Sequence, residues 1–338
     1  MRSQQPDVIV VGAGIIGSSI AWRLAQRGLR VQLRDAGRLG GQASGAGAGM
    51  LAPGGELDEA SPFAALLMES RRLYPEFVGE LSDTTGIPIY FNRCGALDIA
   101  GTEKEWNALT VRAESQAAMG IRSERFGSDS LFYPDDAVVE PGHVLQALRT
   151  ACEACGVSIV ENSPVARLDA LEADAIVLAA GAWSSQIPGG PHALPRSFPV
   201  KGHLIGYDLE PNSFGPIRRS GHTYLLQRSN GFVVAGASTE HLGFDTEVDP
   251  SIADDVRVRA EGLYPPLSGV TPSRFWTGLR PGIDATEPAI GPVAGTRLWL
   301  AYGHYRNGIL AAPATAARIA SGITSNWETV SPVLPNSL

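Results

Sequence analysis

A short apolar strand that runs directly into a cluster of glycines is the feature that most limits how this chain folds. Residues 7–11 are mostly apolar and β-branched, as a buried parallel strand requires. Gly12 permits a tight turn, Gly14 lets the backbone approach a pyrophosphate, and Gly17 lets the next helix pack on the strand. This order predicts a Rossmann-type unit that binds a dinucleotide.

The segment after the glycines completes that unit. A helix is expected over residues 15–27, ended by Gly28, and a second strand over residues 29–33 leads to Asp35. An acid roughly twenty residues beyond the glycines accepts hydrogen bonds from ribose hydroxyls. The alternative for Asp35 is a solvated carboxylate at the end of a strand.

A second glycine-rich segment, residues 40–51, consists mostly of small residues and ends in Met50 and Leu51. Such density lets backbone N–H groups surround an anionic or extended ligand. A flexible linker is the alternative. The apolar end of the segment favours a packed, ligand-binding loop.

Two sheets of different kinds are expected. Alternating strands and helices predict a parallel sheet that binds a ligand at its carboxyl edge. Its further elements are a helix over 141–154 and strands over 157–160, 174–183 and 298–301. The middle of the chain predicts an antiparallel sheet with flanking helices. Its strands are two on either side of a turn at 93–95, then 202–208, a hairpin of 222–228 and 232–237, and 273–279 ending at Arg280; its helices are 103–119 and 252–263.

The closing segment narrows the ligand. Residues 302–308 lead into a helix expected over 309–323, with Pro313 in its first turn. A helix N-terminus beside a bound ring stabilises negative charge there, and a two-electron-reduced flavin carries its charge near N1 and the C2 carbonyl. The first glycine cluster alone fits any dinucleotide, whereas the two ends of the chain together favour FAD.

Over nearly its whole length the chain resembles the D-amino-acid oxidase family of FAD-dependent oxidoreductases. The resemblance rests on residues 12–17, 45–51, 179–183, 199–202, 275–282 and 303–313, and 276–281 and 303–310 are most similar to the glycine-oxidising branch. It implies an α/β fold, in which an α+β substrate domain built on an antiparallel sheet is inserted into a Rossmann-type FAD-binding domain. The FAD-binding domain is expected over 1–85, 139–198 and 289–338, and the substrate domain over 86–138 and 199–288.

The resemblance also assigns site residues by position. Arg280 is expected to bind the substrate carboxylate, which a planar guanidinium fork matches bidentately. Tyr224 helps to hold that carboxylate, and Arg306 assists binding or charge stabilisation beside the flavin. The alternatives are a surface arginine, a core tyrosine and a loop charge. The expected FAD contacts are Gly12, Gly14, Ile15, Ile16, Asp35, Ala43, Ser44, Gly47, Gly49, Met50, Val165, Ala180, Gly181, Trp183, Arg306, Asn307, Gly308, Ile309 and Leu310.

Three departures from the family pattern bear on these expectations. Asp35 stands where relatives often have Glu, which shortens its reach toward the ribose. His203 follows Lys201-Gly202 where Gln is expected, so a flavin-side or structural contact there differs. Residues 168–174 are too few for the hairpin that relatives carry at this point.

The cysteines point to FAD held without a covalent bond. Relatives that attach flavin covalently use a cysteine near the segment that matches Arg280, and this chain has only Cys94, Cys152 and Cys155. The last two form a C-x-x-C near the C-terminal end of a predicted helix, whereas a redox pair gains its low thiolate pKa at a helix N-terminus. So few cysteines fit a reducing compartment.

Composition excludes several classes of protein. A length of 338 residues suggests about two domains, and a net charge of −8 argues against a nucleic-acid partner. The apolar runs are too short to cross a bilayer and residues 1–6 too short and polar for a signal peptide, so a cytoplasmic location is expected. No metal site is expected, because the histidines lack ligand spacing: His143, His192, His203, His222, His241 and His304.

The expected reaction is oxidative deamination of glycine or a small D- or N-alkyl amino acid. The amine binds neutral, a hydride moves to flavin N5, and the imine hydrolyses to an oxo acid; no side-chain base is required. Molecular oxygen then reoxidises the flavin and gives hydrogen peroxide, and the resemblance adds a place in thiamine biosynthesis. Three alternatives stay open: a dehydrogenase of the same fold that reduces a quinone or a protein, a flavoprotein that modifies a tRNA base, and a non-catalytic flavin-binding or assembly protein. A homo-oligomer is also left open.

Overall fold

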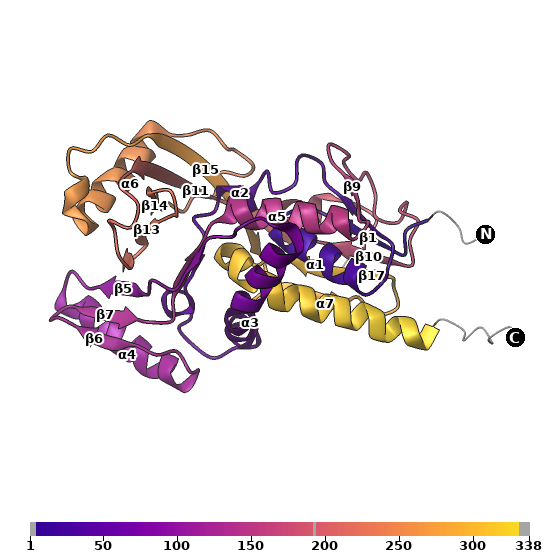
Figure 1. Ribbon diagram of the computed structural model, residues 1–338, viewed down its shortest axis with the longest axis horizontal. Helices are drawn as coiled ribbons and strands as arrows, with labels where there is room; N and C mark the ends of the chain where they lie inside the picture. The colour runs from indigo at the N-terminus through magenta and orange to yellow at the C-terminus, as the bar shows by residue number, and fades with distance from the viewer. Residues whose placement is uncertain (1–4, 192–193, 331–338) are drawn as a thin grey trace, which may run out of the picture.

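The structure, a computed structural model, describes residues 5–191 and 194–330. His192 and residues 1–4 and 331–338 therefore lie outside the described part. Figure 1 shows a parallel sheet with its helices at one end of the molecule and a larger, mostly antiparallel sheet at the other. The predicted α/β fold class is confirmed.

The six-stranded sheet has the order β16-β17-β10-β1-β2-β9. All its pairs are parallel except β16 with β17. Its strands are β1 (Val8–Val11), β2 (Val31–Arg34), β9 (Ser158–Val160), β10 (Ala175–Leu178), β16 (Ala289–Pro292) and β17 (Leu298–Tyr302). All six fall in the ranges predicted for FAD binding, and the five strands predicted for this sheet are confirmed; the domain boundaries stay a prediction.

Four helices pack together against one face of this sheet (Figure 1). They are α1 (Ile15–Gln26), α3 (Pro62–Thr85), α5 (Pro141–Ala154) and α7 (Gly308–Val330). The predicted α1 and α5 are confirmed. The 24-residue α3 was not predicted, although Ser61 caps it by accepting from the Ala64 N–H at 3.0 Å and Gly86 ends it with φ of 70°.

The last helix differs from the expectation at its start. A 3₁₀ turn, η4 (Tyr305–Asn307), continues directly into α7 at Gly308. Pro313 consequently lies inside the helix rather than in its first turn, so that part of the prediction is wrong. The strand β17 (Leu298–Tyr302) runs one residue further than expected, and Gly303, with a φ of 86°, then turns the chain into η4, so the loop between them is short.

The eight-stranded sheet has the order β15-β11-β14-β13-β12-β5-β7-β6. Its strands are β5 (Ala96–Ile99), β6 (Glu124–Phe126), β7 (Ser130–Tyr133), β11 (Ser197–Asp208), β12 (Ile217–Ser220), β13 (Thr223–Gln227), β14 (Phe232–Gly236) and β15 (Arg274–Ile283). The hairpin of β13 and β14 is confirmed. The sheet is antiparallel as predicted, except that β12 and β5 pair in parallel and join two antiparallel groups.

Two further strand predictions need correction. The strands on either side of residues 93–95 do not pair, because β4 (Phe91–Asn92) belongs to a separate small sheet with β3 (Met50–Leu51) and β8 (Ala137–Val139). The strand expected to end at Arg280 instead continues to Ile283, because β11 pairs with it along its whole length. Arg280 thus projects from a paired strand rather than from a loop.

The remaining elements flank these sheets. They are α2 (Ala43–Ala46), α4 (Glu103–Ala118) and α6 (Pro250–Leu263), with the 3₁₀ turns η1 (Pro53–Gly55), η2 (Gly181–Gln186) and η3 (Pro265–Leu267). Residues 168–174 form no strand; Leu168 and Leu171 instead pack on the second face of the parallel sheet. Both α4 and α6 are confirmed near their predicted bounds.

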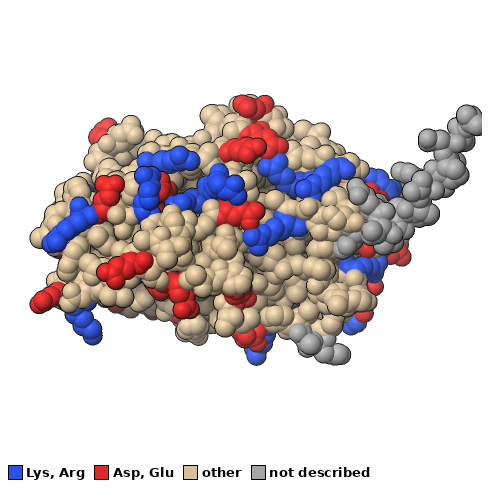
Figure 2. All heavy atoms as spheres, turned by 90° about the horizontal axis from the view of Figure 1, so that it is seen from below, with Lys and Arg blue, Asp and Glu red and all other residues tan. Residues whose placement is uncertain are grey.

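The surface in Figure 2 carries Lys and Arg side chains interspersed with Asp and Glu. Within the described part of the chain, no helix is both long and apolar enough to cross a membrane.

Candidate functional site

A cavity of about 520 Å³ separates the carboxyl edge of the parallel sheet from β11, β13 and β15. That volume lies in the range of small-molecule and cofactor sites. Of the residues predicted for the site, every one except Leu310 lines this cavity. Leu310 is buried in the main hydrophobic core of the four helices, so its side chain does not face the cavity.

The first wall of the cavity is backbone from the turn between β1 and α1. Gly12 has a φ of 105°, and a Cβ there would lie 2.3 Å from the Ala179 oxygen. A Cβ on Gly17 would lie 1.9 Å from the Gly12 oxygen, so the helix packs too closely for any side chain. Gly14 has no side chain with which to cap α1, and the Ile15 N–H donates to Ser44, so the backbone donors left for an anionic ligand at this helix N-terminus are those of Ile16 and Gly17.

Asp35 stands at the end of this wall and organises it. Its Oδ2 accepts from the Ala13 N–H at 2.7 Å and its Oδ1 from the Gly37 N–H at 2.8 Å. These bonds exclude a merely solvated carboxylate. Since each carboxylate oxygen has a second lone pair, ribose contact stays available to Asp35 as a prediction.

The small-residue segment that follows is packed, and the linker alternative is wrong. Ser44, in the short helix α2, accepts from the Ile15 N–H at 2.9 Å. From the opposite sheet, Trp276 Nε1 donates to the Ala46 oxygen at 2.9 Å, and Arg228 Nη2 donates to the Gly47 oxygen at 2.7 Å. The segment therefore connects the two walls of the cavity.

Residues after β10 and β17 complete the cofactor end. Gly181, with φ of 56°, turns the chain into η2, where Trp183 lines the cavity and packs on Phe244 with ring centroids 5.0 Å apart. Arg306, Asn307, Gly308 and Ile309 line the cavity from η4 and the start of α7. The N-terminus of α7 thus faces the cavity, as the flavin prediction requires.

His304 is buried between this closing segment and α7. It is 2% exposed, and its Nε2 lies 3.2 Å from the Thr315 hydroxyl. Burial lowers the pKa of His304 to about 4. The ring is therefore neutral at physiological pH.

Arg280 and Tyr224 project from the opposite wall. Arg280 Nη1 donates to the oxygens of Ser238 at 3.1 Å and Lys201 at 3.3 Å, and a Cβ on Gly202 would lie 2.4 Å from Arg280 Nη2. Within the described residues, Arg280 forms no ion pair. Its cavity position excludes the surface alternative and leaves a guanidinium edge for an anionic ligand.

Tyr224, on β13, lines the same wall as Arg280, which is on β15. A Cβ on Gly236 would lie 2.8 Å from the Tyr224 hydroxyl, so only glycine leaves room for the ring. Burial raises the pKa of Tyr224, which keeps the phenol protonated and able to donate. Because the ring lines the cavity, it is not a core tyrosine.

Arg306 has a partner that was not predicted. Its Nη2 lies 2.8 Å from Glu56 Oε1, and both side chains line the cavity. Burial raises the pKa of the Glu56 carboxyl, while Arg306, Arg219 and Arg280 oppose that rise. Residues 39–55 contain no charged side chain, so Glu56 was visible in the sequence as the first charge after a long neutral segment.

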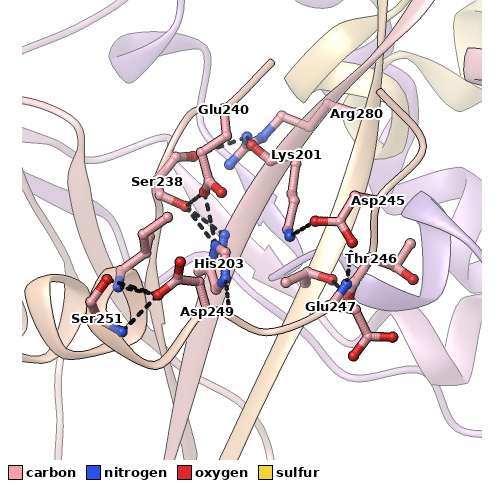
Figure 3. Close-up of polar contacts among 12 residues, drawn as sticks. Lys201, His203, Ser238, Glu240, Asp245, Thr246, Glu247, Asp249, Ser251 and Arg280 are labelled. Atoms are coloured by element: carbon pink, nitrogen blue, oxygen red, sulfur yellow. Dashed lines mark hydrogen bonds and ion pairs between the residues drawn. The ribbon is translucent and has the colours of Figure 1, made fainter. Parts of the chain in front are cut away.

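His203 replaces the expected Gln in a network that holds Arg280 in position (Figure 3). Its Nδ1 lies 2.8 Å from Glu240 Oε1, and its Nε2 accepts from the Asp249 N–H at 2.8 Å. Its own N–H donates to the Ser238 hydroxyl at 2.7 Å. The Ser238 backbone oxygen accepts a hydrogen bond from Arg280. His203 therefore fixes the segment of residues 238–249, called the Ser238 strap below, that positions the guanidinium.

Lys201, two positions before His203 on β11, holds the Ser238 strap through a second side chain. Its side chain is almost fully buried, and Nζ contacts Asp245 Oδ2 at 2.5 Å (Figure 3). A charge buried to this degree requires such a partner. Lys201 and His203 together anchor residues 238–249 against β11.

The cysteines lie away from the cavity. Cys152 is buried in α5, where burial raises its pKa to about 12, and Cys155 caps the C-terminus of that helix. The pair therefore lies at the end of the helix where a thiolate is not stabilised, as predicted. Among the described residues, no group of His, Cys, Asp and Glu is arranged to hold a metal ion.

The donor set fits FAD. A glycine-lined turn and the N-terminus of α1 suit the pyrophosphate, Asp35 stands near the expected ribose, and the start of α7 suits the ring. The fold and this cavity together define an oxidoreductase of the flavoprotein class.

Comparison with known proteins gives the family. The model of the family described as FAD dependent oxidoreductase (DAO) matches residues 7–321. The chain belongs to this family of FAD-dependent oxidoreductases, as its sequence predicted, and FAD is its cofactor.

The similarity to individual relatives is moderate in sequence identity. The chain is 33% identical to the bifunctional protein ThiO/ThiG of Synechocystis sp., over 97% of this chain and 53% of that protein, so it spans about half the length of this relative. It is 30% identical to the glycine oxidase of Bacillus subtilis, over 95% and 94% of the two chains. The crystal structure of glycine oxidase from Geobacillus kaustophilus superposes with a TM-score of 0.90 at 26% identity, covering 98% and 97%.

Proposed function

We propose that this protein is an FAD-dependent oxidase of glycine or of a small D- or N-alkyl amino acid. The observation that carries the proposal is Arg280, a guanidinium that lines the cavity and, among the described residues, donates only to backbone oxygens. Similarity to glycine oxidases supports the same substrate class. Bound FAD would supply the two-electron oxidation of the substrate at its α-carbon and the passage of those electrons to molecular oxygen.

The chain's own residues bind and orient the substrate. Arg280 holds the carboxylate through two N–H donors, and the protonated Tyr224 donates to the same group. These contacts fix the α-carbon in front of the flavin, so that orientation supplies much of the rate. The N-terminus of α7 stabilises negative charge as it develops on the ring.

The amine is bound in its neutral form, so the chain does not have to supply a base. The sequence offered no candidate base, whereas the structure places the Glu56 carboxylate in the cavity. Because one oxygen of Glu56 is occupied by Arg306 at 2.8 Å, we assign it no proton transfer.

The test is a substrate panel on the purified, yellow holoenzyme. Glycine, sarcosine, D-alanine and D-proline are supplied in air while oxygen uptake, peroxide and oxo acid are measured. Equal amounts of peroxide and oxo acid support the oxidase. Bleaching of the flavin without air, followed by no recovery in air, identifies a dehydrogenase, and a dye-coupled assay then measures its turnover.

Two other outcomes reject the proposal. No bleaching by any amine identifies a flavin-binding protein without this catalysis, and retention of tRNA on the holoenzyme supports the base-modifying alternative. The role in thiamine biosynthesis is part of the proposal; it predicts that deleting the gene creates a thiamine requirement that the Arg280→Ala variant fails to relieve.

A further inference from the structure

We infer that Glu56 restricts the cavity to substrates with a single carboxylate, because it keeps Arg306 paired and leaves Arg280 to bind the one carboxylate that enters. The inference rests on the proposed function, since it names which amino acids that site accepts. Glu56 is in this view a specificity-determining residue rather than a catalytic one.

The ion pair is partly shielded from water. Glu56 Oε1 and Arg306 Nη2 are 2.8 Å apart, and their side chains are 11% and 29% exposed. A charge-assisted hydrogen bond in such surroundings is stronger than a surface ion pair. A substrate group that competes for Arg306 must therefore displace a carboxylate already in contact.

The backbone on both sides of Glu56 is fixed. Gln116 Nε2 donates to the oxygens of Gly54 at 2.8 Å and Leu57 at 2.7 Å. The Gly54 N–H donates to the buried Asp136 at 3.4 Å. These bonds come from α4 and from the residue that precedes β8, so the backbone that carries the Glu56 side chain is held in position before any ligand arrives.

The charges at the substrate end then select the ligand. Arg280 and Arg306 carry two positive charges and Glu56 one negative, which leaves a single positive charge for the ligand to neutralise. A monocarboxylate with a neutral amine matches it. A dicarboxylate would have to take Arg306 from Glu56 and leave that carboxylate buried without its partner, which is strongly unfavourable.

Two thioethers that differ by one carboxylate test this directly. (Methylthio)acetate has the shape of sarcosine and thiodiacetate that of iminodiacetate, and each is titrated into holoenzyme while the flavin absorbance reports binding. We expect wild type to bind the monoacid about 100-fold more tightly, and Glu56→Gln to tighten thiodiacetate by roughly tenfold or more while it changes the monoacid by less than about threefold. Wild type that binds both acids equally, or a Glu56→Gln variant that changes both in parallel, overturns the inference.

Three further variants separate charge from folding. Glu69→Gln breaks a comparable pair with Arg318 on the surface and must leave both affinities unchanged. Glu56→Asp keeps the charge and must keep the discrimination. Arg306→Met leaves Glu56 as an unpaired anion and must still reject thiodiacetate, so it remains informative if Glu56→Gln loses its flavin; equal binding of the two acids by Arg306→Met contradicts the inference.

Oxygen uptake with glycine and iminodiacetate is measured in parallel. A kcat/KM ratio that shifts toward iminodiacetate in Glu56→Gln agrees with the binding result. If wild type oxidises no amine, the proposed function fails, while the two titrations still decide the charge selection by themselves.

Discussion

One wall of the cavity is made of backbone and small side chains, whereas the opposite wall is made of long charged ones. The cofactor wall depends on Gly12, Gly14 and Gly17, where a single methyl group would collide with neighbouring backbone or side-chain atoms. The substrate wall depends on Arg280 and Tyr224, and Arg306 with its partner Glu56 completes the substrate end from the side of η4. The first wall excludes side chains to admit FAD, whereas we propose that the side chains of the second choose the substrate.

Removing the guanidinium of Arg280 should have the largest effect. Arg280→Ala is expected to lower kcat/KM for glycine roughly 1000-fold, or about 4 kcal/mol, mostly through KM, because the carboxylate loses its charged partner. Steady-state oxygen uptake measures this. Arg280→Lys should recover only part of the loss. The control Arg318→Ala, on the surface, should leave kcat/KM unchanged. A KM within threefold of wild type in Arg280→Ala would remove this residue from the site.

A methyl group on the cofactor wall should come next. Gly17→Ala places a Cβ 1.9 Å from the Gly12 oxygen and should destabilise the protein by about 3 kcal/mol while it weakens FAD retention. Urea unfolding and the flavin content of purified protein measure both effects. Gly79→Ala is the matched control on α3, where no atom lies within 4 Å of the new Cβ, and a gain of about 0.5–1 kcal/mol is expected there.

The pH dependence of the unfolding free energy should next report on the buried His304, which lies at the cofactor end of the cavity. Burial lowers the pKa of His304 to about 4 in the folded protein, against an ordinary value of 6.5, so its neutral form stabilises the fold above pH 6.5. That contribution, about 3 kcal/mol at most, is lost as pH falls from 6.5 toward 4. His304→Gln should show a smaller loss of unfolding free energy over this interval, and parallel curves for the two proteins would contradict the assignment.

The smallest change is the loss of one hydroxyl from the substrate wall. Tyr224→Phe removes a neutral donor and should raise KM for glycine by about threefold to tenfold, with kcat altered less. Binding of (methylthio)acetate measured by flavin absorbance should weaken to the same extent. An effect as large as that of Arg280→Ala would mean that the ring positions the arginine rather than the substrate.

The cofactor wall could be predicted from the sequence because its signals are local. Three glycines at fixed spacing between a strand and a helix define a backbone geometry without reference to the rest of the chain. The same holds for α1 and α5, whose bounds were predicted to within a residue or two. The closing loop was recognisable for a similar reason, although the 3₁₀ turn that moved Pro313 into the helix was not.

The substrate wall depends on pairings between distant segments, and these leave little local signal. Glu56 and Arg306 are 250 positions apart, and neither residue indicates the other. The extension of β15 beyond Arg280 follows from its register with β11, and the parallel pairing of β12 with β5 follows from a similar long-range contact. His203 was noticed as a departure, but its role in holding the Ser238 strap required the position of Asp249.

The cavity takes its walls from both ends of the described chain, and this sets the order of events during synthesis. The turn at Gly12 leaves the ribosome early, whereas η4 and the start of α7 emerge only after β17 has been made. A nascent chain therefore carries an open, half-lined cofactor site until these segments have emerged, and a purified fragment that ends at Gly295 is expected to retain no flavin. Capture of FAD thus has to follow the synthesis and folding of η4 and the start of α7.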